Sequence, residues 1–171
     1  MSNLKNILVR GVLSLADSLR KMQDLQVKLM AGEVKDGMEH FEPYGFTSNA
    51  NAGAEVLAGF FGGNRSHGVV ICVADRRFRL QGLESGEVAL YTDEGDKLHF
   101  KRGRVIEIET MTLKVKAESA VEFDTPLIRT TGKIVSDGDQ VAAGVSQIDH
   151  PHDGVMKGTA TSGPPVPAAV K

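Results

Sequence analysis

The second half of the chain alternates apolar and polar residues over a long distance with few turn signals. Ile106 and Ile108 set one phase of this alternation, and Met111 and Leu113 begin the other. Side chains on a strand point alternately to two faces, so the pattern predicts one apolar face and one polar face. The apolar residues are too sparse to cover both faces of a lone sheet, and a single chain would leave unpaired strand edges. We therefore predict that three copies wind around one axis as an intertwined β-prism over roughly residues 112–160.

Short β-forming runs separated by turn signals precede this segment. The expected strands cover residues 55–61, 67–74, 77–80, 87–92, 97–101 and 104–109. Gly62-Gly63-Asn64 marks one turn, and Asp93 to Asp96 marks a hairpin loop. Such closely spaced short strands are typical of a small barrel of the oligonucleotide/oligosaccharide-binding type, the OB-fold.

Residues 3–31 carry an apolar stripe with the spacing of one helix face. Its members, three or four residues apart, are Leu4, Leu8, Val12, Leu15, Leu19 and Met22. Ser2 or Asn3 is a possible N-cap, and Gly32 lies just beyond the expected C-terminal end. The stripe predicts an N-terminal helix that packs either on its own domain or on another chain.

These patterns together predict a mainly β chain in three segments. An N-terminal helical segment covers residues 1–35, an OB-fold domain covers residues 36–111, and a triple-stranded β-helix with a C-terminal apex covers residues 112–171.

Charge and composition argue against a nucleic-acid partner. The net charge is −2, aromatic residues make up only 5%, and the basic cluster is limited to Arg76, Arg77 and Arg79 with a few neighbours. Contact with acidic partner subunits or ordinary solvation is the expected use of these arginines. The lone Cys72 excludes an intramolecular disulfide, and its apolar surroundings (Val69 to Val73) predict a buried, inert thiol.

The sequence carries no run of 18 or more apolar residues that would indicate a membrane span. The N-terminus resembles a secretion signal only superficially, because charges recur at Arg10, Asp17 and Arg20 and no small-residue cleavage site follows. We therefore expect a protein that is made and folded in a cytoplasm.

Near the C-terminus, His150 and His152 stand on either side of Pro151. On an extended backbone, residues two apart project from the same side, so both imidazoles point the same way. One chain then offers a metal ion two ligands, and three chains around an axis offer six, which complete an octahedron. The alternative is a pair of exposed loop histidines, because Pro151 and Gly154 favour a loop.

The other polar residues predict no second metal site and no catalytic site. His40, His67 and His99 are expected at the surface or in a hydrogen bond. Asp137 and Asp139 lack an EF-hand pattern, so a turn is expected there rather than a cation site. The carboxylates of the alternating segment, which carry no cleft signal, are Glu118, Glu122 and Asp124. We expect no enzyme; the alternative function is an OB-fold binding module with a metal-dependent hydrolytic C-terminal tail.

Five short motifs, spread in order over almost the whole chain, carry a resemblance to a known family. They are Pro43–Ser48, Gly62–His67, Asp75–Arg77, Gly86–Tyr91 and His150–Val155. In this combination the chain resembles the phage baseplate assembly protein V family, and most closely the central tail spikes of Mu-like contractile phages.

The resemblance implies a structural virion protein. In that family a homotrimeric spike at the tip of the tail tube pierces the host outer membrane when the sheath contracts. The N-terminal part attaches to the baseplate hub, an OB-fold follows, and a triple-stranded β-helix ends in a pointed apex. Expected partners are the two other copies, hub and tail tube proteins and, transiently, the host outer membrane. The expected location is the tip of the tail baseplate, after assembly in the host cytoplasm.

The resemblance also implies an iron site. In that family the His-x-His pairs of three chains bind one iron ion octahedrally near the tip, which puts one iron per trimer on His150 and His152. Six imidazole nitrogens leave no open position, so the metal would be structural; they argue against zinc and fit iron, with nickel as a further option. Calcium and chloride are associated with the β-helix interior and are candidates here. Asp153 replaces the family's usual glycine and adds a carboxylate beside each histidine pair.

Overall fold

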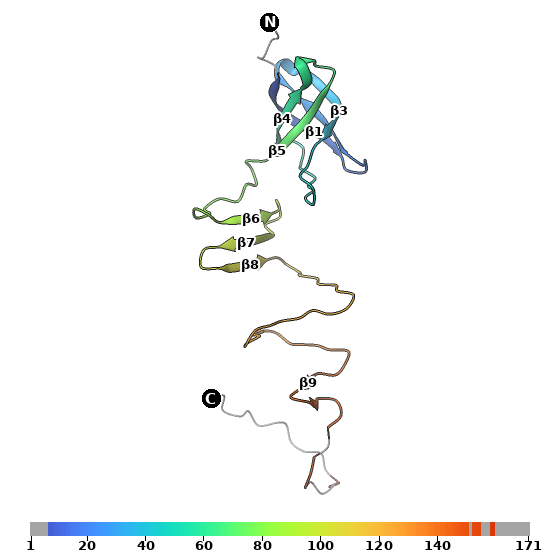
Figure 1. Cartoon of the computed structure of the whole chain (residues 1–171), viewed down its shortest axis with the longest axis vertical. Coiled ribbons are helices and arrows are strands. Elements are labelled where there is room, and N and C mark those ends of the chain that lie inside the picture. The colour runs from blue at the N-terminus through green and yellow to red at the C-terminus, as the bar shows by residue number, and fades with distance from the viewer. Residues whose placement is uncertain (1–6, 151, 155–157, 160–171) are drawn as a thin grey trace. The chain divides into compact units, whose positions relative to one another are not determined.

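A computed structural model of the chain describes residues 7–150, 152–154 and 158–159, and strands account for most of its regular structure (Figure 1). The chain divides into two compact units, Met1–Val115 and Lys116–Lys171. Apart from two 3-10 turns, η2 (Met30–Gly32) and η3 (Phe61–Gly63), no helix occurs in the described residues. Consequently, nothing in that part of the chain is a helix with the length and hydrophobicity required to cross a bilayer.

Five strands of the first unit form a closed barrel. They are β1 (Leu8–Asp17), β2 (Gln23–Lys28), β3 (Val34–His40), β4 (Glu55–Phe60) and β5 (Gly68–Ala74). Their order around the barrel is β1-β2-β3-β5-β4, and every pair is antiparallel except β3 and β5, which run parallel through His40 and Val70. A five-stranded barrel of this kind is OB-like, which confirms the predicted barrel and the mainly β class.

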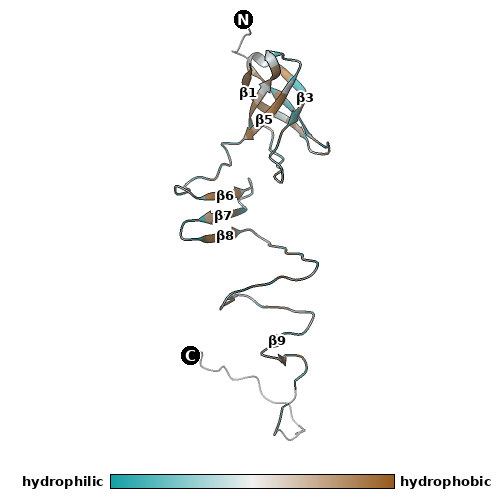
Figure 2. Ribbon diagram, viewed as in Figure 1, coloured by the Kyte–Doolittle hydropathy of each residue, from teal (hydrophilic) through white to brown (hydrophobic). Residues whose placement is uncertain are grey.

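Alternate residues of the barrel strands fill its core. The buried apolar side chains are Val9, Leu13, Leu25, Val27, Leu29, Met38, Ala54, Val56, Ala58, Phe60 and Val70. β1 and β5 are rich in hydrophobic residues, whereas β3 is more hydrophilic (Figure 2). A Cβ atom on Gly68 would lie only 2.5 Å from the ring of Phe60, so this strand start has no room for a larger residue.

The helix predicted over residues 3–31 is wrong, because β1 and β2 occupy most of that range. Val9 and Leu13 point into the core with the period of a strand. A Cβ atom on Gly11 would meet Val27 at 2.6 Å, so the close approach of the two strands requires glycine there. The outward side chains of β1 that produced the apparent helical stripe are Leu8, Val12 and Leu15. Apolar residues thus occupy both faces of β1, so its sequence fits a helical and a strand period equally well. The segment is a strand because it pairs with β2 and β4 to close the barrel. The expected caps Ser2 and Asn3 lie outside the described residues.

The strands predicted between residues 87 and 109 exist but do not belong to the barrel. β6 (Val88–Tyr91), β7 (Lys97–Lys101) and β8 (Val105–Glu109) form a separate three-stranded antiparallel sheet. The predicted hairpin loop joins β6 to β7, where the Thr92 N–H donates to the Asp96 carbonyl at 3.0 Å. The barrel closes without these strands because the N-terminal segment supplies two of its five.

Two predictions about β5 and the residues after it are also wrong. Cys72 is exposed rather than buried, because the β4–β5 register shifts between Leu57 and Ala58 and leaves Ile71 and Cys72 both facing outward. Residues 77–80 form no strand; the Arg79 N–H instead donates to the Asp75 carbonyl at 3.1 Å in a turn.

The second unit contains one short hairpin, β9 (Val141–Ala142) and β10 (Val145–Ser146). Ala143 and Gly144 between them both have positive φ, 51° and 81°, as a type I′ turn requires. No strand occurs from residue 110 to residue 140, and the apolar side chains there are exposed; they include Leu113, Val115, Val121, Phe123, Leu127 and Ile134. The triple-stranded β-helix and the segment boundaries at residues 35 and 111 stay predictions. Pro151, Val155 and the Pro-rich tail at residues 163–167 lie outside the described residues.

Candidate metal centre

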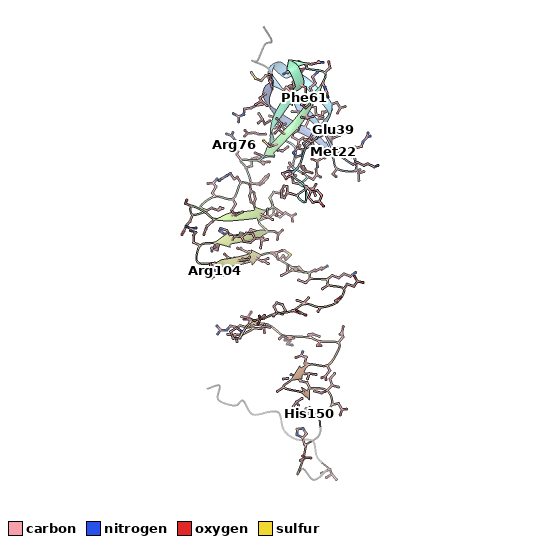
Figure 3. The ribbon with its side chains drawn as sticks, viewed as in Figure 1. Met22, Glu39, Phe61, Arg76, Arg104 and His150 are labelled. Atoms are coloured by element: carbon pink, nitrogen blue, oxygen red, sulfur yellow. The ribbon has the colours of Figure 1, made fainter. Side chains whose placement is uncertain are left out.

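The predicted histidine pair follows β10 in the second unit, and Figure 3 labels its first member, His150. His150 and His152 are both exposed. Their ring centroids lie 4.7 Å apart, and the ring planes make an angle of 70°. The two imidazoles therefore lie side by side, exposed and outside the described strands, and metal binding by this pair stays a prediction.

A backbone carbonyl selects the tautomer of one neutral ring. The Nδ1 atom of His150 lies 2.7 Å from the carbonyl oxygen of Ser146. Because a carbonyl only accepts, Nδ1 carries the proton and donates. The lone pair is then on Nε2, and metal-ligating histidines typically donate their other ring N–H to a carbonyl or carboxylate in this way.

The turn that carries the Ser146 carbonyl is held by Asp139. Asp139 Oδ1 accepts the backbone N–H of Gln147 at 3.0 Å and that of Ile148 at 3.1 Å. A hydrogen bond from the Ser146 hydroxyl, followed by these backbone donors, lowers the pKa of the Asp139 carboxyl below its ordinary value. Asp139 thus organises a turn, and Asp137 beside it is exposed.

The two rings meet edge to face, with centroids 4.7 Å apart and planes at 70°, which is the ordinary packing geometry of two aromatic rings. Within the described part of the chain, no group of three or more His, Cys, Asp or Glu side chains is placed to hold a metal. One chain therefore offers two ligands at this site, an incomplete set.

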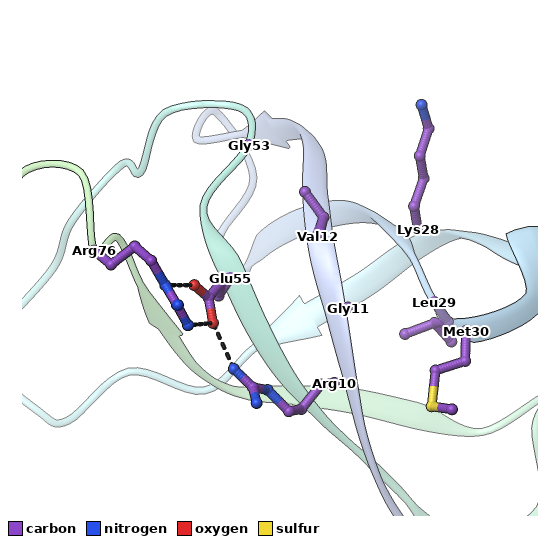
Figure 4. Close-up of a pocket in the computed structure, with 9 residues that line it drawn as sticks. All are labelled: Arg10, Gly11, Val12, Lys28, Leu29, Met30, Gly53, Glu55 and Arg76. Carbon is purple, nitrogen blue, oxygen red and sulfur yellow. Dashed lines mark hydrogen bonds and ion pairs between the residues drawn. The ribbon is translucent and has the colours of Figure 1, made fainter.

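The predicted basic cluster is largely neutralised within the barrel unit. Glu55 Oε2 accepts from Arg10 Nη2 at 2.6 Å and from Arg76 Nη2 at 2.8 Å, on the wall of a shallow pocket (Figure 4). Arg76, and then Arg10, lower the pKa of the Glu55 carboxyl. Arg77 pairs in the same way with Asp75, at 2.5 Å. Two of the three clustered arginines are therefore occupied by carboxylates of their own chain.

The remaining histidines have structural partners. His40 is buried, and its Nδ1 donates to Gln23 Oε1 at 3.1 Å. His99 is buried with Nε2 3.0 Å from Glu87 Oε2, and His67 is exposed, with its ring near that of Phe61. The carboxylates of the alternating segment, Glu118, Glu122 and Asp124, are exposed.

Comparison with known proteins identifies the family. The family model described as "Bacteriophage Mu Gp45, N-terminal" matches residues 10–77. The chain is 35% identical over 150 residues to the baseplate puncturing device gp45 of Escherichia phage Mu, covering 87% of this chain and 76% of the relative. This chain belongs to the phage Mu gp45 family. It is also 33% identical over 162 residues to the Mu-like prophage FluMu protein gp45 of Haemophilus influenzae, covering 88% of each. The predicted resemblance to Mu-like spikes is confirmed.

The Mu gp45 family model ends near the end of the barrel, so the β6–β8 sheet and the histidine pair lie beyond the residues it matches. This sheet has a feature that the sequence reasoning missed. The register aligns Val88, Phe100 and Ile106 in one row and Leu90, Leu98 and Ile108 in the next, so all six lie on one face. Five of the six are exposed, and Leu98 is half-buried. We name these six residues the apolar face.

The opposite face of the same sheet is polar and internally paired. Lys97 Nζ lies 2.6 Å from Glu109 Oε2, and Lys101 Nζ lies 2.8 Å from Glu107 Oε2. The alternation that signals this two-faced sheet was recognised in the sequence but was assigned to the barrel. Because the barrel is complete without these strands, the apolar face has no role in the barrel core.

Proposed function

We propose that this chain is a structural protein of a phage tail baseplate, where it forms a homotrimeric central spike that pierces the host outer membrane when the sheath contracts. Family membership supports this proposal, because the relative from phage Mu is named a baseplate puncturing device. The location would be the tip of the virion's tail, after assembly in the host cytoplasm. The partners would be baseplate hub and tail tube proteins, with the membrane as a transient contact. The role would be mechanical rather than enzymatic.

The apolar face is the main structural observation that supports a trimer. A contiguous row of exposed Val, Leu, Phe and Ile side chains is uncommon on a monomer and marks an interaction surface. Residues 110–140 present further exposed apolar side chains along a stretch without strand partners within the described chain. Two more copies would cover both surfaces and pair the free backbone groups, which gives the triple-stranded β-helix that we propose for the shaft.

The histidine pair supports the same stoichiometry. Three chains that each contribute His150 and His152 would supply six nitrogens, the number required by an octahedral iron ion. A bound ion would supply a crosslink among the chains. The contribution of this chain is to hold the two rings side by side and to keep the proton of a neutral His150 on Nδ1. Calcium and chloride in the shaft interior rest on the family resemblance alone.

Mass and metal content test the proposal together. Light scattering on the purified chain should give three times the chain mass of 18.3 kDa, and elemental analysis should give one iron per three chains. A monomer would refute the trimer. One or more metal ions per chain would instead favour a hydrolytic metal site on an OB-fold binding module.

Substitution of the histidine pair tests whether assembly of the trimer depends on the metal. Replacing His150 and His152 together by alanine should abolish bound iron and leave the trimer intact, because apolar burial carries assembly. A monomeric double variant would show that this division of labour is wrong.

A further inference from the structure

Successive backbone N–H groups in the turn between β10 and His150 donate hydrogen bonds to side chains. The backbone N–H groups of Gln147 and Ile148 both donate to Asp139 Oδ1. Ser146 Oγ accepts the N–H of Asp149 at 2.8 Å and that of Ile148 at 3.2 Å. Two side chains therefore bind three successive backbone donors immediately before His150.

This hydrogen bonding links two segments that the β9–β10 hairpin separates in sequence. Asp139 lies just before β9, and the donors that it binds lie just after β10. The Gln147 N–H also donates to the Gln140 carbonyl at 3.0 Å, so the two segments stay paired beyond the last strand residue. The Ser146 carbonyl is thereby fixed where it faces the His150 ring, at 2.7 Å from Nδ1.

The position of that carbonyl has a chemical consequence. A neutral imidazole carries its proton on either ring nitrogen, and only the nitrogen without the proton can bind a metal. A fixed acceptor beside Nδ1 favours the form with a free lone pair on Nε2. Without the turn, His150 would populate both forms and several ring orientations, and metal binding would have to select one of them.

We propose that Asp139 and Ser146 are positioning residues that set the tautomer and orientation of His150 for metal binding. This inference rests on the metal site proposed above and extends it to residues that do not touch the ion. Partners that hydrogen-bond a metal ligand directly typically contribute 10- to 100-fold in metal affinity. The Asp139 and Ser146 side chains hold such a partner, the Ser146 carbonyl, so we expect an effect at the lower end of this range.

The test uses the full-length chain and two readouts. The first is the nitrogen and carbon chemical shifts of His150 in the metal-free protein, which distinguish a proton on Nδ1 from one on Nε2. The second is the dissociation constant for ferrous iron, measured by competition with a chelator. In the wild-type chain we expect the Nδ1–H form. In Asp139→Ala and in Ser146→Ala we expect mixed tautomers and an iron dissociation constant raised about 10-fold.

Two controls separate positioning from general damage. Asp137→Ala removes an exposed carboxylate two residues away, which receives no hydrogen bond from the described residues, and should leave both readouts unchanged. Asp139→Asn keeps an oxygen acceptor and should restore most of the affinity lost in Asp139→Ala. The trimer mass should be the same in all variants.

The outcomes are distinguishable from failure of the proposed function. If Asp139→Ala and Ser146→Ala keep the wild-type tautomer and iron affinity, the positioning role is overturned even though iron binds. If the wild-type chain binds no iron, the metal site itself fails, while the tautomer measurement still decides whether the two side chains orient His150.

Discussion

Ile106 and Val105 offer a matched test of the apolar face. They are neighbours on β8, they are 61% and 52% exposed, and they point to opposite faces of the sheet. Replacing Ile106 by alanine removes roughly 40 Å² of apolar surface that the proposed trimer would bury, which at about 25 cal/mol per Å² costs about 1 kcal/mol per chain and about 3 kcal/mol per trimer. Because dissociation into three chains depends on the square of the concentration, the half-dissociation concentration should rise about 10-fold.

The assay is light scattering over a dilution series, with circular dichroism to verify that each variant keeps its β content. Val105→Ala trims an exposed apolar side chain on the opposite, mostly polar face and should leave the dissociation curve unchanged. If the two substitutions shift the curve equally, or neither shifts it, the apolar face is not the trimer contact and the reasoning fails.

Three further predictions concern the stability of the single chain. Gly68→Ala should lower the free energy of unfolding by about 1–3 kcal/mol, measured by urea titration, because the added methyl group meets the ring of Phe60. The backbone N–H of Arg102 donates a hydrogen bond to Glu87, and this is the largest cause that lowers the pKa of the Glu87 carboxyl from 4.5. The ionised carboxylate therefore stabilises the fold above pH 4.5, and this stabilisation is lost as the pH falls through the lowered pKa. Thermal midpoints between pH 7 and pH 3 should therefore fall less steeply in Glu87→Gln than in the wild type, and an identical slope would contradict the assignment. Ala143→Asn should raise the thermal midpoint of the second unit, since asparagine tolerates the positive φ that this turn position imposes, and a lower midpoint would count against the type I′ turn.

The sequence predicted the class of the fold better than the type of its first element and the sheet to which each later strand belongs. The turns after β4 and β6 and the strands beside them follow from local residue chemistry, and these predictions are confirmed. The N-terminal helix failed because β1 carries apolar residues on both faces, so its sequence fits a helical period as well as a strand period. Gly11 was the residue that could have decided the matter, since glycine in the middle of an amphipathic helix is unfavourable. The need for glycine at this position becomes visible only when Val27 lies against it.

The proximity of His150 and His152 was predictable because the placement of two side chains separated by one residue depends on local backbone geometry alone. The support from Asp139 was not predictable in the same way. Its donors lie eight and nine residues further on, beyond a two-residue turn, and only the β9–β10 pairing brings them back to its carboxylate. The apolar face was not predicted for a related reason. Its alternation is visible in the sequence, but only the structure shows that the barrel closes without β6–β8 and leaves this face uncovered.

The pairing of β1 with β4 affects how the barrel is made. During synthesis Leu8 emerges long before its partner Gly59. The barrel therefore cannot close until about fifty further residues have been synthesised. A truncated protein that started at residue 36 would lack β1 and β2 and would leave β3 and β4 as unpaired edge strands. Residues 8–28 are thus part of the barrel rather than a separate segment, so an attachment made by β1 or β2 would use the outer surface of the barrel.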